Sequence, residues 1–99
     1  MSLHSIKFQR IPQTRAQLGI SNSALYREME EGLFPRPVKF GERTAVHPVH
    51  EVEAVIGARL NGVTPDQLRK LVADLMEKRK EYLPDSMRST SVSGLEAAT

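Results

Sequence analysis

The stretch that decides the fold reads Leu18-Gly19-Ile20-Ser21-Asn22-Ser23-Ala24-Leu25-Tyr26-Arg27. Gly19 tolerates a left-handed backbone and can end a helix, and the Ser21 hydroxyl can cap the first turn of the next helix. Within that second helix, Leu25 and Met29 stand four residues apart and share one face. A helix, a glycine turn and a capped helix form the helix-turn-helix pattern, whose second helix enters the DNA major groove. The sequence therefore predicts a DNA-binding protein.

The second helix of this motif has a polar face opposite Leu25. Asn22 can pair with adenine and Ser23 with several base edges, whereas Tyr26 and Arg27 suit phosphate oxygens. The candidate DNA contacts on this helix are therefore Ser21, Asn22, Ser23, Tyr26 and Arg27. Two other interpretations stay open: Asn22 and Ser23 only cap and solvate the helix, and Tyr26 packs half-buried against the core.

Breaker residues set the limits of the two helices. Pro12 suits a first helical turn and predicts a helix over about Gln13 to Leu18. This helix is weak by propensity, because Thr14 stands where a larger apolar residue would pack better. The second helix is predicted from about Asn22 to Glu31, and Gly32 fits its end. The residues expected to make early core contacts are Phe8 and Ile11.

Pro35 and Pro37 forbid a helix in the segment that follows. Val38 and Phe40 alternate with a polar residue, a Gly-Glu turn occupies 41–42, and residues 44–46 can return as a second strand. This pattern predicts a two-stranded hairpin, which we call the wing. Its two cations are expected to contact phosphate or the minor groove, although as lone surface charges they would be ordinary. These cations are Lys39 and Arg43.

Two more helices are predicted in the C-terminal half. Apolar residues follow one stripe between Val49 and Leu60, and Asn61-Gly62 ends this helix. A capping box at Thr64 and Gln67, with a proline between them, begins a helix that runs to about residue 83. Its apolar stripe can pack on the chain's own core or bind a second copy. We favour a homodimer through Leu68, Leu71 and Leu75.

Together these elements predict a mainly α fold with a small β-hairpin, a winged helix-turn-helix with an added C-terminal helix. The expected organisation is a DNA-binding domain over 7–62, the C-terminal helix over 64–83 and a tail over 84–99. The tail is rich in Ser and Thr, and we expect it to be disordered.

Composition narrows the function. The 99 residues carry a formal charge of only +2, but 6–46 holds seven basic and four acidic residues, a local charge of +3. A basic face there can carry a phosphate footprint. The chain has no cysteine and no apolar run long enough for a membrane span, so we expect a soluble, cytoplasmic protein without disulfides.

No catalytic or metal-binding arrangement stands out. There is no nucleophile–base constellation and no Gly-rich phosphate loop after a strand, so we expect neither an enzyme nor a cofactor. His47 and His50 lie three residues apart without a third ligand nearby. We expect His47 to replace an aromatic core residue and His50 to face water.

Several of these residues occur in the order of a known family. Leu18 to Arg27, Gly32, Phe34-Pro35, Pro37-Val38-Lys39, Gly41, Arg43 and Glu51-Val52 resemble the AlpA-like regulators. These are DNA-binding proteins of prophages and plasmids, related to the excisionases and to the MerR winged-helix group. The resemblance spans roughly Phe8 to Asn61. It implies a winged helix-turn-helix that binds DNA near promoters or attachment sites, as a transcriptional regulator or as an excision factor acting architecturally.

A different class of function stays open. The stripe through Leu68 can serve a protein-interaction module without DNA specificity, and such a module has no need of cations on a hairpin. RNA binding is a weaker option, because the chain has no aromatic-rich RNA motif. Salt-dependent retention on heparin or duplex DNA distinguishes these classes.

Overall fold

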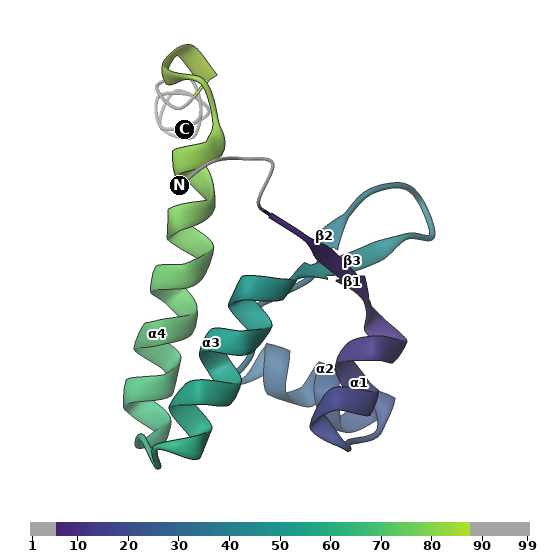
Figure 1. The fold of residues 1–99 in the computed structure, drawn as a ribbon, viewed down its shortest axis with the longest axis vertical. Helices are drawn as coiled ribbons and strands as arrows, with labels where there is room; N and C mark the ends of the chain where they lie inside the picture. Colours follow the sequence, from purple (N-terminus) through teal and green to yellow (C-terminus); the bar gives the residue numbers. More distant parts are fainter. Residues whose placement is uncertain (1–5, 88–99) are drawn as a thin grey trace.

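The computed structural model describes residues 6–87. It is mainly helical with one small sheet, as the sequence predicts (Figure 1). Most of the expected tail, residues 88–99, lies outside the described residues. The elements in chain order are β1 (Phe8–Arg10), α1 (Ile11–Leu18), α2 (Asn22–Glu30), β2 (Val38–Lys39), β3 (Ala45–Pro48), α3 (Val49–Leu60), α4 (Pro65–Lys78) and the short 3₁₀ helix η2 (Arg79–Tyr82).

The residues predicted to begin and end the helices do so in the structure. Gly19 ends α1 with φ +69°, and Gly32 follows α2 with φ +77°. The Ser21 Oγ accepts from the Ala24 N–H at 3.1 Å. Thr64 and Gln67 form the capping box of α4. The first helix begins earlier than predicted, at Ile11, and the last α-helix ends at Lys78 and continues as η2.

The sheet differs from the predicted two-stranded hairpin. It has three antiparallel strands in the order β1-β3-β2, because residues 8–10 pair with β3 on the side away from β2. In this register Gln9 lies opposite His47. Phe8 remains 44% exposed and packs against Phe40, so its expected role as a core contact is largely wrong.

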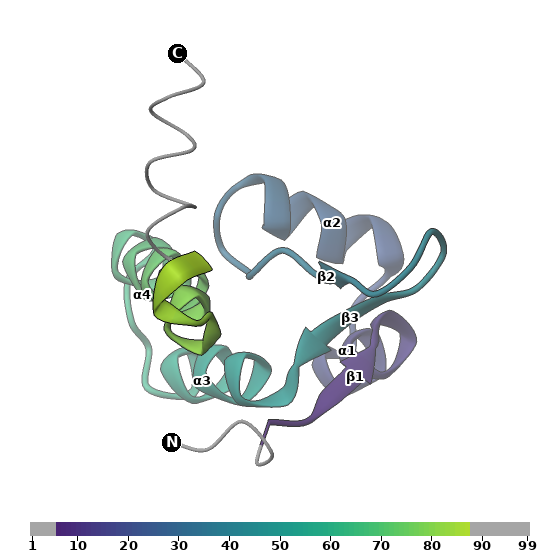
Figure 2. The same ribbon diagram turned by 90° about the horizontal axis from the view of Figure 1, so that it is seen from above.

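One hydrophobic core joins the motif to the C-terminal helices. Helix α4 lies beside α3 in Figures 1 and 2, and its Leu68 and Val72 are buried. The apolar stripe of α4 therefore packs on the chain's own core, and Leu68 is not free to meet a second copy. At the far end of α3, Leu60 is 81% exposed although it continues the predicted stripe. The core consists of Leu25, Met29, Phe34, Val52, Val55, Leu68 and Val72. Among residues 6–87, no helix is long and apolar enough to cross a membrane.

Candidate nucleic-acid interface

The polar face of α2 is open to solvent. Leu25 and Met29 are buried on the opposite side of this helix. Tyr26 is also on the surface, with 41% of the residue exposed. The exposed candidates on this face and at its cap are Ser21, Asn22, Ser23, Tyr26 and Arg27.

The beginning of α2 suits an anionic partner. Its first turn contains no acidic residue, and the N–H groups of a helix N-terminus favour negative charge. Because the Ser21 oxygen accepts from Ala24, this side chain sets the start of the helix and keeps its O–H as a possible donor. The acidic side chains on α2 lie toward its other end. Of these, Glu28 forms an ion pair with Arg59 of α3 at 2.6 Å, which ties α2 to α3.

The hairpin between β2 and β3 carries the two predicted wing cations. Lys39 and Arg43 are both exposed. The Lys39 Nζ lies 3.4 Å from the Glu42 carbonyl oxygen, so this amine folds back across the turn. In both Figure 1 and Figure 2, the free end of the hairpin and the beginning of α2 lie on the same side of the molecule. This arrangement presents both groups of candidate residues to that side.

A buried polar relay joins the helix-turn-helix to the sheet. Gln9 Nε2 donates to Thr14 Oγ1 at 2.8 Å, and His47 Nε2 lies 2.9 Å from the Pro35 carbonyl oxygen. A carbonyl only accepts, so Nε2 carries the His47 proton and Nδ1 is left to accept from Thr14 Oγ1, at 3.4 Å. The ring also meets Phe34 edge-on, at 5.0 Å between centroids. The relay therefore fixes α1, β1 and β3 against the segment that leads out of α2.

The sequence anticipated only part of this relay. Both His47 and Thr14 are fully buried, which confirms the expectation that His47 is a core residue. The expectation that a larger apolar residue would pack better at Thr14 overlooked its hydroxyl, which links Gln9 and the histidine. A buried histidine requires polar partners. The sequence therefore indicates that a buried His47 has polar partners, but it does not identify Thr14, which lies 33 positions away, as one of them.

Protonation of His47 would break the relay. Burial lowers the pKa of this imidazole below its usual value, opposed by the hydrogen bond to Pro35 and the charge of Glu51 and reinforced by Arg79. The unfolded chain therefore binds a proton at higher pH than the folded protein does. The contribution of neutral His47 to the free energy of unfolding is complete above the unfolded pKa of about 6.5. It is lost as the pH falls from there through the lower pKa of the folded protein.

We therefore expect the free energy of unfolding to decrease as the pH falls from about 8 to about 5.5. Urea titrations at several pH values measure this change. The matched control is His47→Gln, whose amide can still donate to Pro35 but does not titrate, and its pH dependence should be smaller. Equal pH dependence in the two proteins would show that His47 is not responsible.

A second buried contact joins η2 to the rest of the fold. The Arg79 guanidinium makes two bonds to the fully buried Glu51 carboxylate, at 2.6 and 2.9 Å. The same guanidinium donates to the Arg36 carbonyl oxygen at 2.8 Å, just before the wing begins. The Arg36 N–H meets the Met76 sulfur at 3.4 Å. The end of α4 is thus fixed to α3 and to the base of the wing, an arrangement that sequence reasoning missed.

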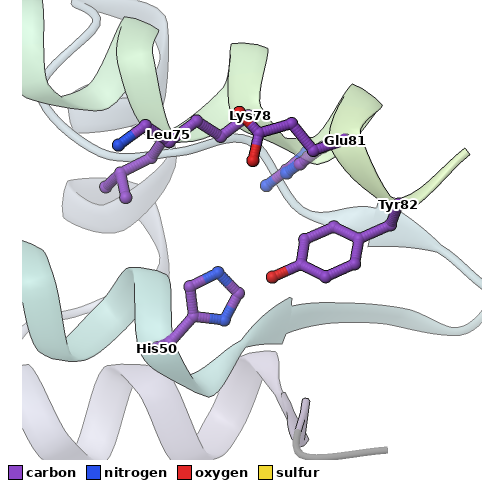
Figure 3. A pocket seen from close by; sticks show the side chains of 6 residues that line it. His50, Leu75, Lys78, Glu81 and Tyr82 are labelled. Carbon is purple, nitrogen blue, oxygen red and sulfur yellow. The ribbon is translucent and has the colours of Figure 1, made fainter. Parts of the chain in front are cut away.

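Two hollows flank this contact. One, of about 410 Å³, lies between the start of α3 and the end of α4, where the Tyr82 ring and His50 point toward each other (Figure 3). The other, of about 260 Å³, lies between the sheet and η2, where Phe8 and Phe40 line it together with Arg79 and Tyr82. His50 lines both hollows and is half-buried, so the expectation that it faces water is only partly met. Within residues 6–87, no group of three or more His, Cys, Asp or Glu side chains could hold a metal ion.

Comparison with known proteins adds one finding. A family model described as "Prophage CP4-57 regulatory protein (AlpA)" matches residues 7–60, more than half of the chain. The matched part runs from β1 to the end of α3 and contains every candidate contact on α2 and on the wing. Searches of curated proteins and of solved structures found no match.

Proposed function

The chain belongs to the AlpA family of prophage regulatory proteins, and from this premise we propose that it is a sequence-specific transcriptional regulator. It binds duplex DNA with the start of α2 in the major groove and the wing on phosphates or in the minor groove. The observation that carries this proposal is the solvent-exposed polar start of α2, free of acidic residues, on the same side as the wing. Selection of DNA fragments by the purified protein, followed by sequencing, tests it directly.

The two groups of residues have different roles in this proposal. Asn22 and Ser23, in the first turn of α2, read base edges. Tyr26 and Arg27 lie one turn further along and bind phosphate, which sets the register of the helix on the duplex without reading sequence. Ser21 fixes the start of the helix through its cap.

Asn22→Ala is expected to weaken binding to a selected site by about 1–3 kcal/mol, with much less effect on random duplex. The reason is that an asparagine amide can make two hydrogen bonds to one adenine. Binding titrations on both duplexes at one salt concentration measure the difference. Glu30→Ala, at the other end of the same exposed face, is the matched control. Equal losses on both duplexes would mean that Asn22 does not read bases.

Lys39→Ala and Arg43→Ala are expected to weaken binding to all sequences alike. Each lost phosphate contact should also reduce the slope of log affinity against log salt by roughly one unit. Titrations at several salt concentrations give this slope. Lys70→Ala is the control, because Lys70 is an exposed cation on α4, and this helix lies away from the wing in Figure 1. If the slope of the wing variants matches that of the unmodified protein, Lys39 and Arg43 do not contact DNA.

The oligomeric state on DNA is a separate question. A homodimer through Leu68, Leu71 and Leu75 stays a prediction, and Leu68 is already occupied by the core of the single chain. Most of the exposed residues of α4 are polar or charged, among them Lys70, Asp74 and Glu77. Sedimentation of the chain at tens of micromolar, alone and with a selected duplex, distinguishes one copy from two.

A further inference from the structure

Phe40 is a large aromatic residue exposed at the end of the wing. The residue is 57% exposed, the largest exposed fraction among the Phe and Tyr residues of 6–87. Its backbone N–H donates to the Thr44 carbonyl oxygen at 2.8 Å, so it stands in the last paired position before the turn. Beyond it only residues 41–43 complete the hairpin. The ring is therefore presented near the tip of the hairpin.

The Phe40 ring has a defined orientation despite its exposure. It packs edge-to-face against Phe8 of β1, with 4.9 Å between ring centroids and 66° between the ring planes. Such contacts favour one arrangement of the two rings. The third strand, which the sequence did not predict, supplies this partner. A ring held in place by a neighbouring strand loses little conformational freedom when it binds.

Two cations flank this ring. Lys39 precedes it and Arg43 lies three residues after it, both exposed. Side chains alternate along a strand, so Lys39 and Phe40 project to opposite faces of the hairpin. A hairpin that carries an apolar ring near its tip, with cations before and after it in the sequence, suits the minor groove, where phosphates line both walls and base pairs form the floor. Proteins that enter this groove often insert an apolar side chain between two base pairs and kink the duplex.

We propose that Phe40 inserts between two base pairs from the minor groove and bends the bound duplex. The inference rests on the proposed function, because it requires DNA binding by the wing. It goes further in assigning a mechanical effect on DNA to one apolar side chain. The competing interpretation is that Phe40 only covers the apolar hollow of about 260 Å³ beside Phe8 and Val38.

The test uses duplexes selected by the purified full chain, carrying a fluorophore at each end or 2-aminopurine at one adenine position at a time. Energy transfer between the ends reports the bend, expected at about 20–90°. The fluorescence of 2-aminopurine rises where a base step loses its stacking. Both signals are read at saturating protein, so a change in affinity or stability alone does not alter them.

For the unmodified protein we expect saturable binding, a bend and one bright 2-aminopurine position. Phe40→Ala should remove most of the bend and of the fluorescence rise, whereas Phe40→Leu should retain a large part of both, because leucine also acts as a wedge. Phe8→Ala, the matched control, keeps the Phe40 side chain but removes its edge-to-face partner, and it should weaken both signals less than Phe40→Ala does. If Phe40→Ala does not fold, Phe40→Thr replaces it, because threonine suits a strand.

Each other result overturns a different statement. Failure of the unmodified chain to bind any duplex overturns the proposed function. Binding without a bend or unstacking, or an unchanged signal in Phe40→Ala, overturns the wedge and leaves DNA binding intact. Equal loss in Phe8→Ala and Phe40→Ala would assign the effect to the integrity of the sheet, and the proposal for Phe40 would then be wrong.

Discussion

Arg79→Ala is expected to lower the free energy of unfolding by about 3–5 kcal/mol, because it leaves a charged carboxylate buried without its partner. Glu51 is fully buried and receives both guanidinium bonds, at 2.6 and 2.9 Å. The Arg36 carbonyl oxygen loses its donor as well. Urea unfolding followed by circular dichroism measures the loss.

Two variants separate the cost of an unpaired charge from the effect of a missing side chain. Lys80→Ala removes the neighbouring cation of a more exposed pair with Glu77, and it should cost less than about 1 kcal/mol. The double variant Glu51→Met with Arg79→Met should recover much of the stability lost in Arg79→Ala, since apolar residues of similar volume often replace a buried ion pair. A loss in Arg79→Ala no larger than in Lys80→Ala would contradict this account of the contact.

Phe34→Ala is expected to destabilise the fold by about 3–5 kcal/mol. The Phe34 ring is fully buried in the core and meets the His47 ring edge-on. Its removal opens a cavity beside the relay and takes away the neighbour that holds the imidazole in place. Thermal and urea unfolding measure the effect.

Phe40→Ala is the matched control, because it makes the same substitution at an exposed ring. Its expected cost is about 1 kcal/mol, mainly the edge-to-face contact with Phe8. The decisive result is the difference between the two losses in the free energy of unfolding. Equal costs would mean that Phe34 contributes no more to the core than a surface ring does.

Local signals predicted the helices well. The limits of α3 match the prediction of 49–60, and α2 ends one residue earlier than expected. The signals were residues with strong backbone preferences or capping side chains, such as Gly19, Ser21 and Thr64. These act within a few positions of themselves, so a single sequence reveals them.

The missed features depend on partners far along the chain. Strand β1 has only three residues, too few for an alternating pattern, and it pairs with a strand near residue 47. The Glu51–Arg79 contact spans 28 positions, and the Thr14–His47 contact spans 33. For α4, the pattern identified an apolar stripe but not its partner. Leu68 suits a neighbouring helix of the same chain as well as it suits a second copy.

The candidate site was also predicted only in part, because local patterns show which residues share a face but not what they contact. The polar face of α2 follows from helical periodicity, and the exposure of Asn22, Ser23 and Arg27 agrees with it. Their contacts with DNA remain predictions. Phe40 was interpreted only as a strand residue. The alternating pattern predicts a strand, but it does not show that this residue is exposed near the tip of the hairpin.

The Glu51–Arg79 contact also sets an order of events during synthesis. The ribosome makes the chain from the N-terminus, so Glu51 emerges 28 residues before the arginine that neutralises it. Until then the carboxylate has no cation from η2, and α3 lacks the cover that α4 provides. The part of the chain that matches the family ends at residue 60. All of it has therefore been synthesised before Arg79 is available to pair with Glu51. A chain that stops short of Arg79 therefore contains the whole matched part but lacks the cation that pairs with Glu51.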